Sequence, residues 1–110
     1  MVQVDKAPEP YVIIVAGTPG VGKSTFASAL AEFLGCKVVE PSRIAVERSL
    51  GTPDPERDGT LIIDEDRLLE AVRGEARGRC TIIATHYPGL FLDDDELNQM
   101  TPLVALLRLN

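Results

Sequence analysis

Hydrophobic residues form short β-branched runs that alternate with segments in which the apolar positions have helical spacing. The runs predict strands buried on both faces, and they lie at residues 11–16, 37–39 and 80–85. The helical spacing predicts helices over residues 23–34 and 65–76. In the first of these helices, Phe26, Leu30 and Leu34 recur every four residues and predict its buried face. This alternation predicts an α/β fold with a parallel sheet.

Capping residues give the expected ends of the helices. Gly35 is a plausible C-terminal stop for the first helix, and Asp64 is the natural N-cap of the helix over 65–76. Between them, Ser42 can cap a helix that runs through Leu50 to a stop at Gly51. Residues 51–60 combine prolines, glycines and charges, which predicts a surface loop.

The two ends of the chain are less regular. Residues 93–100 predict a short helix with an acidic cap, and residues 102–109 fit either a strand or a helix, of which we favour a strand. Residues 1–10 carry prolines and acids without periodicity and predict a flexible leader. The remainder, residues 11–110, is expected to form a single domain.

Composition and charge limit the possible functions. The chain has 110 residues and a net charge of −6, which disfavours autonomous binding to nucleic acid. No apolar run approaches the roughly 20 residues that a membrane span needs, so no membrane partner is expected. Cys36 and Cys80 match neither a zinc site nor a disulfide framework and are interpreted as reduced thiols, which fits the cytoplasm and nucleus.

A glycine-rich segment joins the first strand to the first helix. It reads GTPGVGKST at residues 17–25 and fits the pattern G-x-x-x-x-G-K-[ST] of phosphate-binding loops. Glycines leave backbone amides open to phosphate, and the following helix N-terminus favours anions. Lys23 is expected to reach the β- and γ-phosphates of ATP, and Ser24 to ligate Mg²⁺. The alternative is a glycine-rich turn whose lysine is merely solvated. The predicted cofactor-binding residues are Gly17, Gly20, Val21, Gly22, Lys23, Ser24 and Thr25.

The loop, followed about forty residues later by IDEDRLL at 63–69, resembles the adenylate kinase isoenzyme 6 family, the coilin-interacting nuclear ATPases. The resemblance runs from about residue 12 to residue 86. It implies a three-layer α/β/α nucleoside monophosphate kinase fold, use of ATP and Mg²⁺, and combined adenylate kinase and ATPase activities. It also implies a role in small ribosomal subunit (18S rRNA) maturation, with a small-subunit ribosomal protein as partner.

The resemblance also implies site residues outside the loop. Residues 40–63 would form the monophosphate-binding insert. His86 corresponds to the histidine of the family's Asp-x-His motif and would join Lys23 in catalysis, but Ala84 stands where the family has the acid. Arg43 or Arg48 would replace the family's phosphate-clamping arginine. In this family the chain continues into a lid that carries further arginines. The present sequence is expected to stop before that lid.

Each of these residues also has a structural interpretation. His86 could be a surface or packing residue, and Arg43 and Arg48 could be solvated helix arginines. The acids at 64–66 could serve mainly to complement the helix dipole. Two functions therefore stay open: an ATP-binding adenylate kinase-like phosphotransferase, and a nucleotide-binding module that acts through a protein partner without efficient turnover. A general P-loop ATPase or GTPase is disfavoured, because no acidic metal ligand is evident at the end of a core strand.

Overall fold

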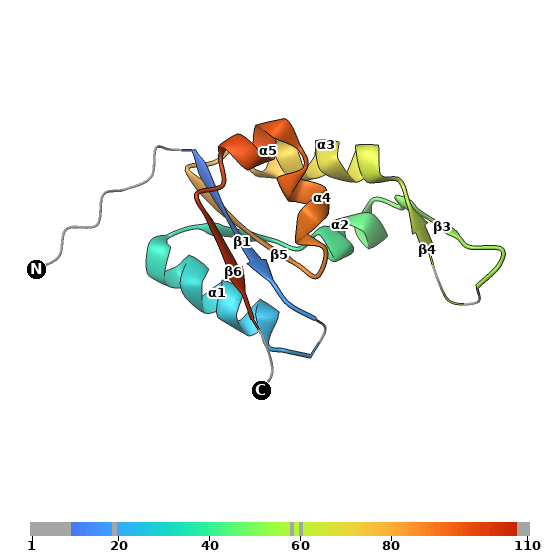
Figure 1. Cartoon of the computed structure of the whole chain (residues 1–110), viewed down its shortest axis with the longest axis horizontal. Helices are drawn as coiled ribbons and strands as arrows, with labels where there is room; N and C mark the ends of the chain where they lie inside the picture. Colours follow the sequence, from blue (N-terminus) through green and yellow to red (C-terminus); the bar gives the residue numbers. More distant parts are fainter. Residues whose placement is uncertain (1–9, 19, 58, 60, 108–110) are drawn as a thin grey trace, which may run out of the picture.

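The computed structural model describes residues 10–18, 20–57, 59 and 61–107, so the leader expected over residues 1–10 lies outside it except for its last residue. The centre is a four-stranded parallel sheet in the order β2-β5-β1-β6 (Figure 1). Its strands are β1 (Tyr11–Ala16), β2 (Lys37–Val39), β5 (Cys80–Thr85) and β6 (Leu103–Leu106). The first three of the predicted strands have the expected bounds. The segment predicted over 102–109 is a strand rather than a helix but is shorter than predicted, and residues 108 and 109 lie outside the described part of the chain.

Helices cover both faces of this sheet. One face is covered by α1 (Lys23–Leu34), and the other by α2 (Pro41–Glu47), α3 (Glu65–Glu75), α4 (Pro88–Leu92) and α5 (Asp95–Gln99) (Figure 1). The predicted three-layer α/β/α arrangement is therefore confirmed. The short helix α4 was not predicted, because five residues that include a proline and a glycine are too few to show a periodic pattern.

The side chains of β1 alternate between the two apolar layers. Val12 and Ile14 are fully buried and pack with the layer of α2–α5, whereas Ile13 and Val15 pack with α1. Burial on both faces explains why the strand is a continuous apolar run. Each such side chain contributes about 1.5–3 kcal/mol of transfer free energy, so the sheet is firmly held beneath the loop that follows β1.

The buried face of α1 agrees only in part with the predicted one. Ala27 and Ala31 are the buried residues of the helix, whereas Phe26 is 41% exposed and Phe33 is 86% exposed. Small side chains let a helix approach a sheet closely, and the two alanines occupy that contact. Leu30 and Leu34 are partly buried and pack against the same cluster, as the spacing predicts, so the prediction is wrong for Phe26. Both ends of α1, including the stop at Gly35, are as predicted.

The start and the end of α2 also differ from the prediction. Pro41 occupies the first helical turn and Glu40 is the N-cap residue, so Ser42 lies inside the helix and does not cap it. The helix ends at Glu47, and the left-handed position after it is taken by Ser49 with φ 53°. Proline is pre-organised for a helix start because its φ is fixed. The predicted continuation to a stop at Gly51 is therefore wrong.

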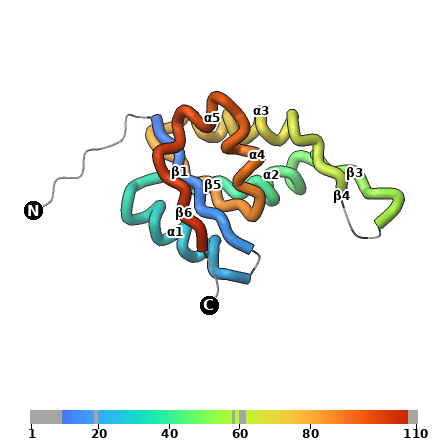
Figure 2. The backbone as a smooth tube through the Cα atoms, in the orientation of Figure 1, coloured from blue at the N-terminus to red at the C-terminus, as the bar shows by residue number. Residues whose placement is uncertain are grey.

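Residues 51–63 form a hairpin rather than a simple loop. β3 (Gly51–Pro53) pairs antiparallel with β4 (Leu61–Ile63), with Thr52 opposite Ile62. Figure 2 shows this hairpin beyond α2 and the start of α3, away from the four-stranded sheet. The segment that the resemblance assigned to a monophosphate-binding insert therefore consists of α2 and this hairpin.

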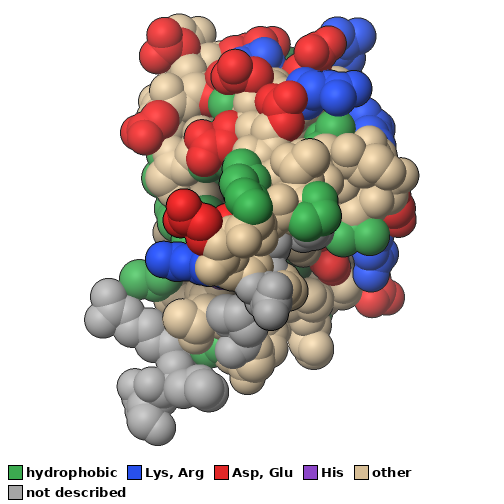
Figure 3. Space-filling view, turned by 90° about the vertical axis from the view of Figure 1, so that its right-hand side faces the viewer, with side chains coloured by type: hydrophobic (Ala, Val, Ile, Leu, Met, Phe, Trp, Pro, Cys, Tyr) green, Lys and Arg blue, Asp and Glu red, His purple; other side chains and the backbone are tan. Residues whose placement is uncertain are grey.

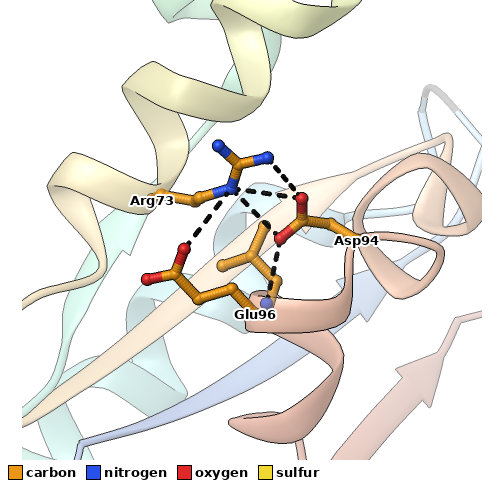
Figure 4. A network of polar contacts seen from close by, with 4 residues as sticks. Arg73, Asp94 and Glu96 are labelled. Carbon is orange, nitrogen blue, oxygen red and sulfur yellow. Dashed lines mark hydrogen bonds and ion pairs between the residues drawn. The ribbon is translucent and has the colours of Figure 1, made fainter.

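Two N-caps and an ion-pair network hold the outer helices. Asp64 accepts a hydrogen bond from the Arg67 amide at 3.2 Å, which confirms the predicted cap of α3. On α5, Asp94 caps the helix through the Leu97 amide at 3.0 Å and also accepts from Nε of Arg73 at 3.1 Å (Figure 4). The Arg73 guanidinium holds the pKa of Asp94 below its usual range. These contacts tie α3 to α5.

The interpretation of the two cysteines as reduced thiols is wrong. Cys36 and Cys80 form a disulfide, with their Cα atoms 5.0 Å apart. The register of the sheet explains their proximity, because Lys37 of β2 pairs with Thr81 of β5 and the residue before each is a cysteine. The cross-link therefore joins the end of α1 and the start of β2 to the start of β5.

The surface agrees with the acidic composition. Figure 3 shows acidic side chains over the upper part of the face that carries the β3–β4 hairpin, next to a smaller basic group and above a hydrophobic area. Across the residues that the structure describes, every helix is too short or too polar to cross a bilayer.

Candidate functional site

The glycine-rich loop starts where β1 ends, at the carboxyl edge of the sheet. Gly17 is buried, and a Cβ there would lie 2.7 Å from Cγ1 of Val21 and 3.1 Å from the carbonyl oxygen of Leu107. A turn follows, closed by the Val21 amide on the Thr18 carbonyl at 3.3 Å, with Gly20 at φ 86°. The loop thus needs glycine for close approach at one position and for a left-handed backbone at another.

The same loop ends as the N-terminus of α1. Gly22, at φ 84°, is the N-cap residue, and it has no side chain that could occupy the first-turn amides. The first turn carries no acidic residue, so nothing within it competes for these donors. A 12-residue helix presents a partial positive charge at this end. Backbone donors and helix dipole together make the loop a cradle for phosphate.

The three polar residues of the motif lie in the first turn of α1. Lys23 is half-buried and forms no ion pair with any carboxylate in the described part of the chain. Ser24 and Thr25 are exposed. The structure therefore keeps the lysine charge and both hydroxyls beside the cradle, as the motif requires for a bound phosphate chain.

A cavity of about 410 Å³ opens beside the loop at the carboxyl edge of the sheet. His86, which follows the last residue of β5, lines it together with the start of the loop. Parallel strands place their carboxyl ends at one edge, which is where ligands bind in open α/β sheets. The other lining residues are Ala16, Gly17, Thr18, Pro88, Leu106 and Leu107. His86 and the start of the loop are thus brought together, whereas Lys23 and the other predicted phosphate-binding residues of the range 20–25 do not line this cavity.

The position of the family's acid is occupied by a core residue. Ala84 is 3% exposed and packs with Ala27 of α1, opposite Val15 in the sheet. The described residues hold no group of three or more His, Cys, Asp or Glu side chains suited to a metal ion. Ser24 is then the residue of the motif that could contribute an oxygen to Mg²⁺, while the nucleotide would supply the other ligands.

A second cavity, of about 330 Å³, lies between α2, α3 and α4, and His86 lines this cavity as well. Its wall is mostly apolar and has no lysine, arginine, aspartate or glutamate. The lining residues are Pro41, Ser42, Ala45, Val46, Ile63, Leu68, Thr85, His86, Tyr87, Leu90 and Phe91. His86 therefore stands between a cavity at the phosphate loop and a separate apolar one.

The two predicted phosphate-clamping arginines lie elsewhere. Arg43 is exposed, with Glu40 at 3.9 Å, and Arg48 pairs with Glu75 at 3.1 Å. Glu75 also binds Lys37, and this hydrogen bond, with a smaller contribution from Arg48, lowers the pKa of Glu75. Neither arginine lines a cavity that contains His86. Their role at an acceptor phosphate stays a prediction.

Sequence reasoning did not identify two groups of residues at these cavities. Leu106 and Leu107 come from β6 and the residue after it, and no local pattern connects them with the loop 90 residues earlier. Tyr87 follows a strand end, the same positional signal that singled out His86, and it could have been found on that ground.

Comparisons with known proteins agree with this geometry. Residues 13–109 match the family model AAA_18, described as an AAA domain. A protein of Saccharolobus solfataricus named "Putative adenylate kinase" is 35% identical over 99 residues, which are 90% of this chain and 49% of that protein. A protein of Pyrococcus furiosus with the same name is 36% identical over 83 residues, 76% of this chain and 44% of its own length. The chain thus spans about half the length of the curated relatives it matches.

A solved structure has the same fold. A gluconokinase from Sinorhizobium meliloti 1021 superposes with a TM-score of 0.53 at 26% identity, covering 92% of this chain and 59% of that one. Both the relatives and this structure are kinases by name. The match to the narrower isoenzyme 6 family is not established by these similarities. The chain belongs to the AAA domain family AAA_18 and is a P-loop kinase-like nucleotide-binding domain.

Proposed function

We propose that the chain is the nucleotide-binding part of an ATP-dependent phosphotransferase of the adenylate kinase type. The observation that carries the proposal is the position of His86, which lines both the cavity at the phosphate loop and the apolar cavity between α2 and α4. A kinase must hold a donor and an acceptor side by side, since transfer of a phosphoryl group depends mainly on positioning and charge stabilisation.

The loop supplies the donor side of this reaction. Its backbone amides and the N-terminus of α1 bind the β- and γ-phosphates of ATP, and Lys23 neutralises charge that develops on the transferring group. Ser24 would offer its hydroxyl to Mg²⁺, which would supply positive charge against the phosphates. The half-buried position of Lys23, without a carboxylate partner among the described residues, keeps its ammonium available for phosphate.

The apolar cavity supplies the acceptor side. The names of the archaeal relatives point to AMP as the acceptor. His86 then stands between the two nucleotides and hydrogen-bonds to the transferring phosphoryl group or to its acceptor. Three properties remain predictions from the resemblance: the ATPase activity, the role in 18S rRNA maturation and the ribosomal-protein partner. The location in cytoplasm and nucleus remains a prediction from the sequence, and the disulfide between Cys36 and Cys80 removes the reduced thiols on which it partly rested.

One observation favours a second function. Ala84 places a buried methyl group where the resembled family has the acid that organises Mg²⁺ and water. Loss of such a charge weakens stabilisation of the transferring phosphoryl group. The alternative is therefore a nucleotide-binding module that retains ATP affinity, has little turnover and acts through a protein partner.

The deciding experiment measures ADP formation from Mg-ATP with and without AMP, together with the binding of a fluorescent ATP analogue. Lys23→Ala is the test variant. Lys37→Ala is the matched control, because Lys37 is an exposed lysine paired with Glu75 and lies outside both cavities. We expect AMP-stimulated turnover in the wild type and in Lys37→Ala, and its loss in Lys23→Ala.

The two candidate functions give different results. If the wild type binds the analogue but forms ADP no faster than Lys23→Ala does, the result supports the binding module and refutes the kinase. Failure of the wild type to bind the analogue refutes both.

A further inference from the structure

Tyr87 is held at the mouth of the apolar cavity by its backbone. Its amide donates to Oγ1 of Thr85 at 3.1 Å, and Thr85 is 6% exposed. Pro88, the next residue, begins α4 and has a restricted φ. The backbone of Tyr87 is therefore anchored on both sides, although its side chain is 69% exposed.

The ring of Tyr87 has one aromatic neighbour. The centroids of the His86 and Tyr87 rings are 4.2 Å apart, with planes inclined by 48°. Both residues line the apolar cavity, and His86 also lines the cavity at the start of the phosphate loop. An exposed aromatic ring thus stands directly beside the histidine that connects the two cavities.

The cavity below this ring suits a flat, uncharged group. Its volume of about 330 Å³ is at the lower end of the range for small-molecule sites. Aliphatic side chains such as Val46 and Leu90 form its wall together with the buried ring of Phe91. Without a lysine or arginine in the wall, the charged end of a ligand would be oriented away from it, toward the loop.

We propose that Tyr87 binds the acceptor nucleotide by stacking on its base. The inference rests on the proposed kinase function, whose acceptor it concerns. Tyrosine offers a large, rigid apolar face at low cost in conformational entropy, and every nucleobase has a π-face on which such a ring can stack. The base lies in the apolar cavity against Tyr87, and the phosphate of the same nucleotide extends past His86 toward the loop.

The chain allows a direct binding test. It contains two tyrosines and no tryptophan, and Tyr11 lies at the opposite end of the sheet, near Cys36. In a Tyr11→Phe variant, the ultraviolet emission therefore comes from Tyr87 alone. We expect AMP to quench this emission saturably and ribose 5-phosphate, which has no base, to leave it unchanged. Equal quenching by both compounds, or by neither, overturns the proposal.

A kinetic test separates stacking from a merely structural role. Tyr87→Ala should raise KM for AMP about tenfold, because stacking on an aromatic ring strengthens binding by a factor of this order, while kcat changes little. Tyr87→Phe keeps the ring and should restore KM. Phe33→Ala is the matched control, since it removes an 86% exposed ring on the outer side of α1.

The outcomes distinguish this proposal from the kinase function. Normal AMP-stimulated turnover with an unchanged KM in Tyr87→Ala overturns the stacking proposal and leaves the kinase function standing. If there is no turnover but AMP saturably quenches the Tyr87 emission of Tyr11→Phe, the kinase function is refuted and the stacking site is supported as a binding site.

Discussion

The disulfide between Cys36 and Cys80 should supply a large part of the stability of this domain. It connects the start of β2 to the start of β5 across 44 residues of sequence. The perturbation we consider is its removal, by the double substitution of Cys36 and Cys80 with alanine. Cys80 is 4% exposed and Cys36 is half-buried, and alanine removes only the Sγ atom at each position, so the loss of packing is small beside the loss of the cross-link.

The magnitude follows from the length of the closed loop. In the chain-entropy treatment, a cross-link stabilises the folded state by restricting the unfolded chain, and the effect grows with the logarithm of loop length. For a separation of 44 residues it gives about 4 kcal/mol at 25 °C. Small domains have a total free energy of unfolding of roughly 5–15 kcal/mol. The loss corresponds to a fall in Tm of about 15 °C.

Urea denaturation under non-reducing conditions measures this difference. We expect the double variant to unfold about 4 kcal/mol more easily than the oxidised wild type, and the wild type in excess dithiothreitol to match the variant. Affinity for the fluorescent ATP analogue should change little below the unfolding transition. The reason is that α1, with 12 residues, separates the cross-link from the phosphate loop by about 18 Å.

Two results would refute this reasoning. Titration of two free thiols in the native, non-reduced protein would show that the cross-link does not form. Equal urea midpoints for the oxidised wild type, the reduced wild type and the double variant would show that the restriction of the unfolded chain does not contribute to stability.

Three further predictions concern the loop, a helix cap and an ion pair. Gly17→Ala should weaken ATP-analogue binding and lower the free energy of unfolding by about 1–3 kcal/mol, since its Cβ would lie 2.7 Å from Val21 Cγ1. The double variant Gly17→Ala/Val21→Ala should recover part of this loss, and the absence of any recovery would contradict the assigned contact. Asp64→Ala should lower the free energy of unfolding by about 1 kcal/mol through loss of the α3 cap, measured by urea denaturation, and an unchanged midpoint would contradict it. The pKa of Asp94 is lower in the folded than in the unfolded protein, so its pairing with Arg73 stabilises the fold above the unfolded pKa of this carboxyl group and loses this effect as pH falls toward the folded pKa. The Tm of Asp94→Asn should therefore vary less with pH between about 5 and 2 than the Tm of the wild type. Parallel pH profiles of Tm would contradict the pairing with Arg73.

Local signals in the sequence were sufficient for the sheet strands, α1, α3 and the phosphate loop. Buried strands are recognisable as β-branched runs because both of their faces are apolar. The cap at Asp64 and the stop at Gly35 act within one turn of their helices, so their effect is readable from neighbouring residues. The loop was recognisable because phosphate binding requires glycine, lysine and serine at fixed spacing.

Other features depend on residues that are distant in sequence. The disulfide requires the register between β2 and β5, which no local pattern specifies. The cavity beside the loop requires Leu107, and the apolar cavity combines α2, β4, α3 and α4. Phe26 was wrongly assigned to the buried face of α1, because close packing against the sheet favours the small side chains of Ala27 and Ala31.

The sequence by itself therefore determined the strands of the parallel sheet, the bounds of α1, the start of α3 and the presence of a glycine-rich loop of the phosphate-binding type between β1 and α1. Only the tertiary structure decided that His86 connects two cavities and that Tyr87 stands at the mouth of the apolar one. The physical reason is that secondary structure and loop chemistry depend on interactions over a few residues, whereas a cavity is made by side chains from elements that packing alone brings together.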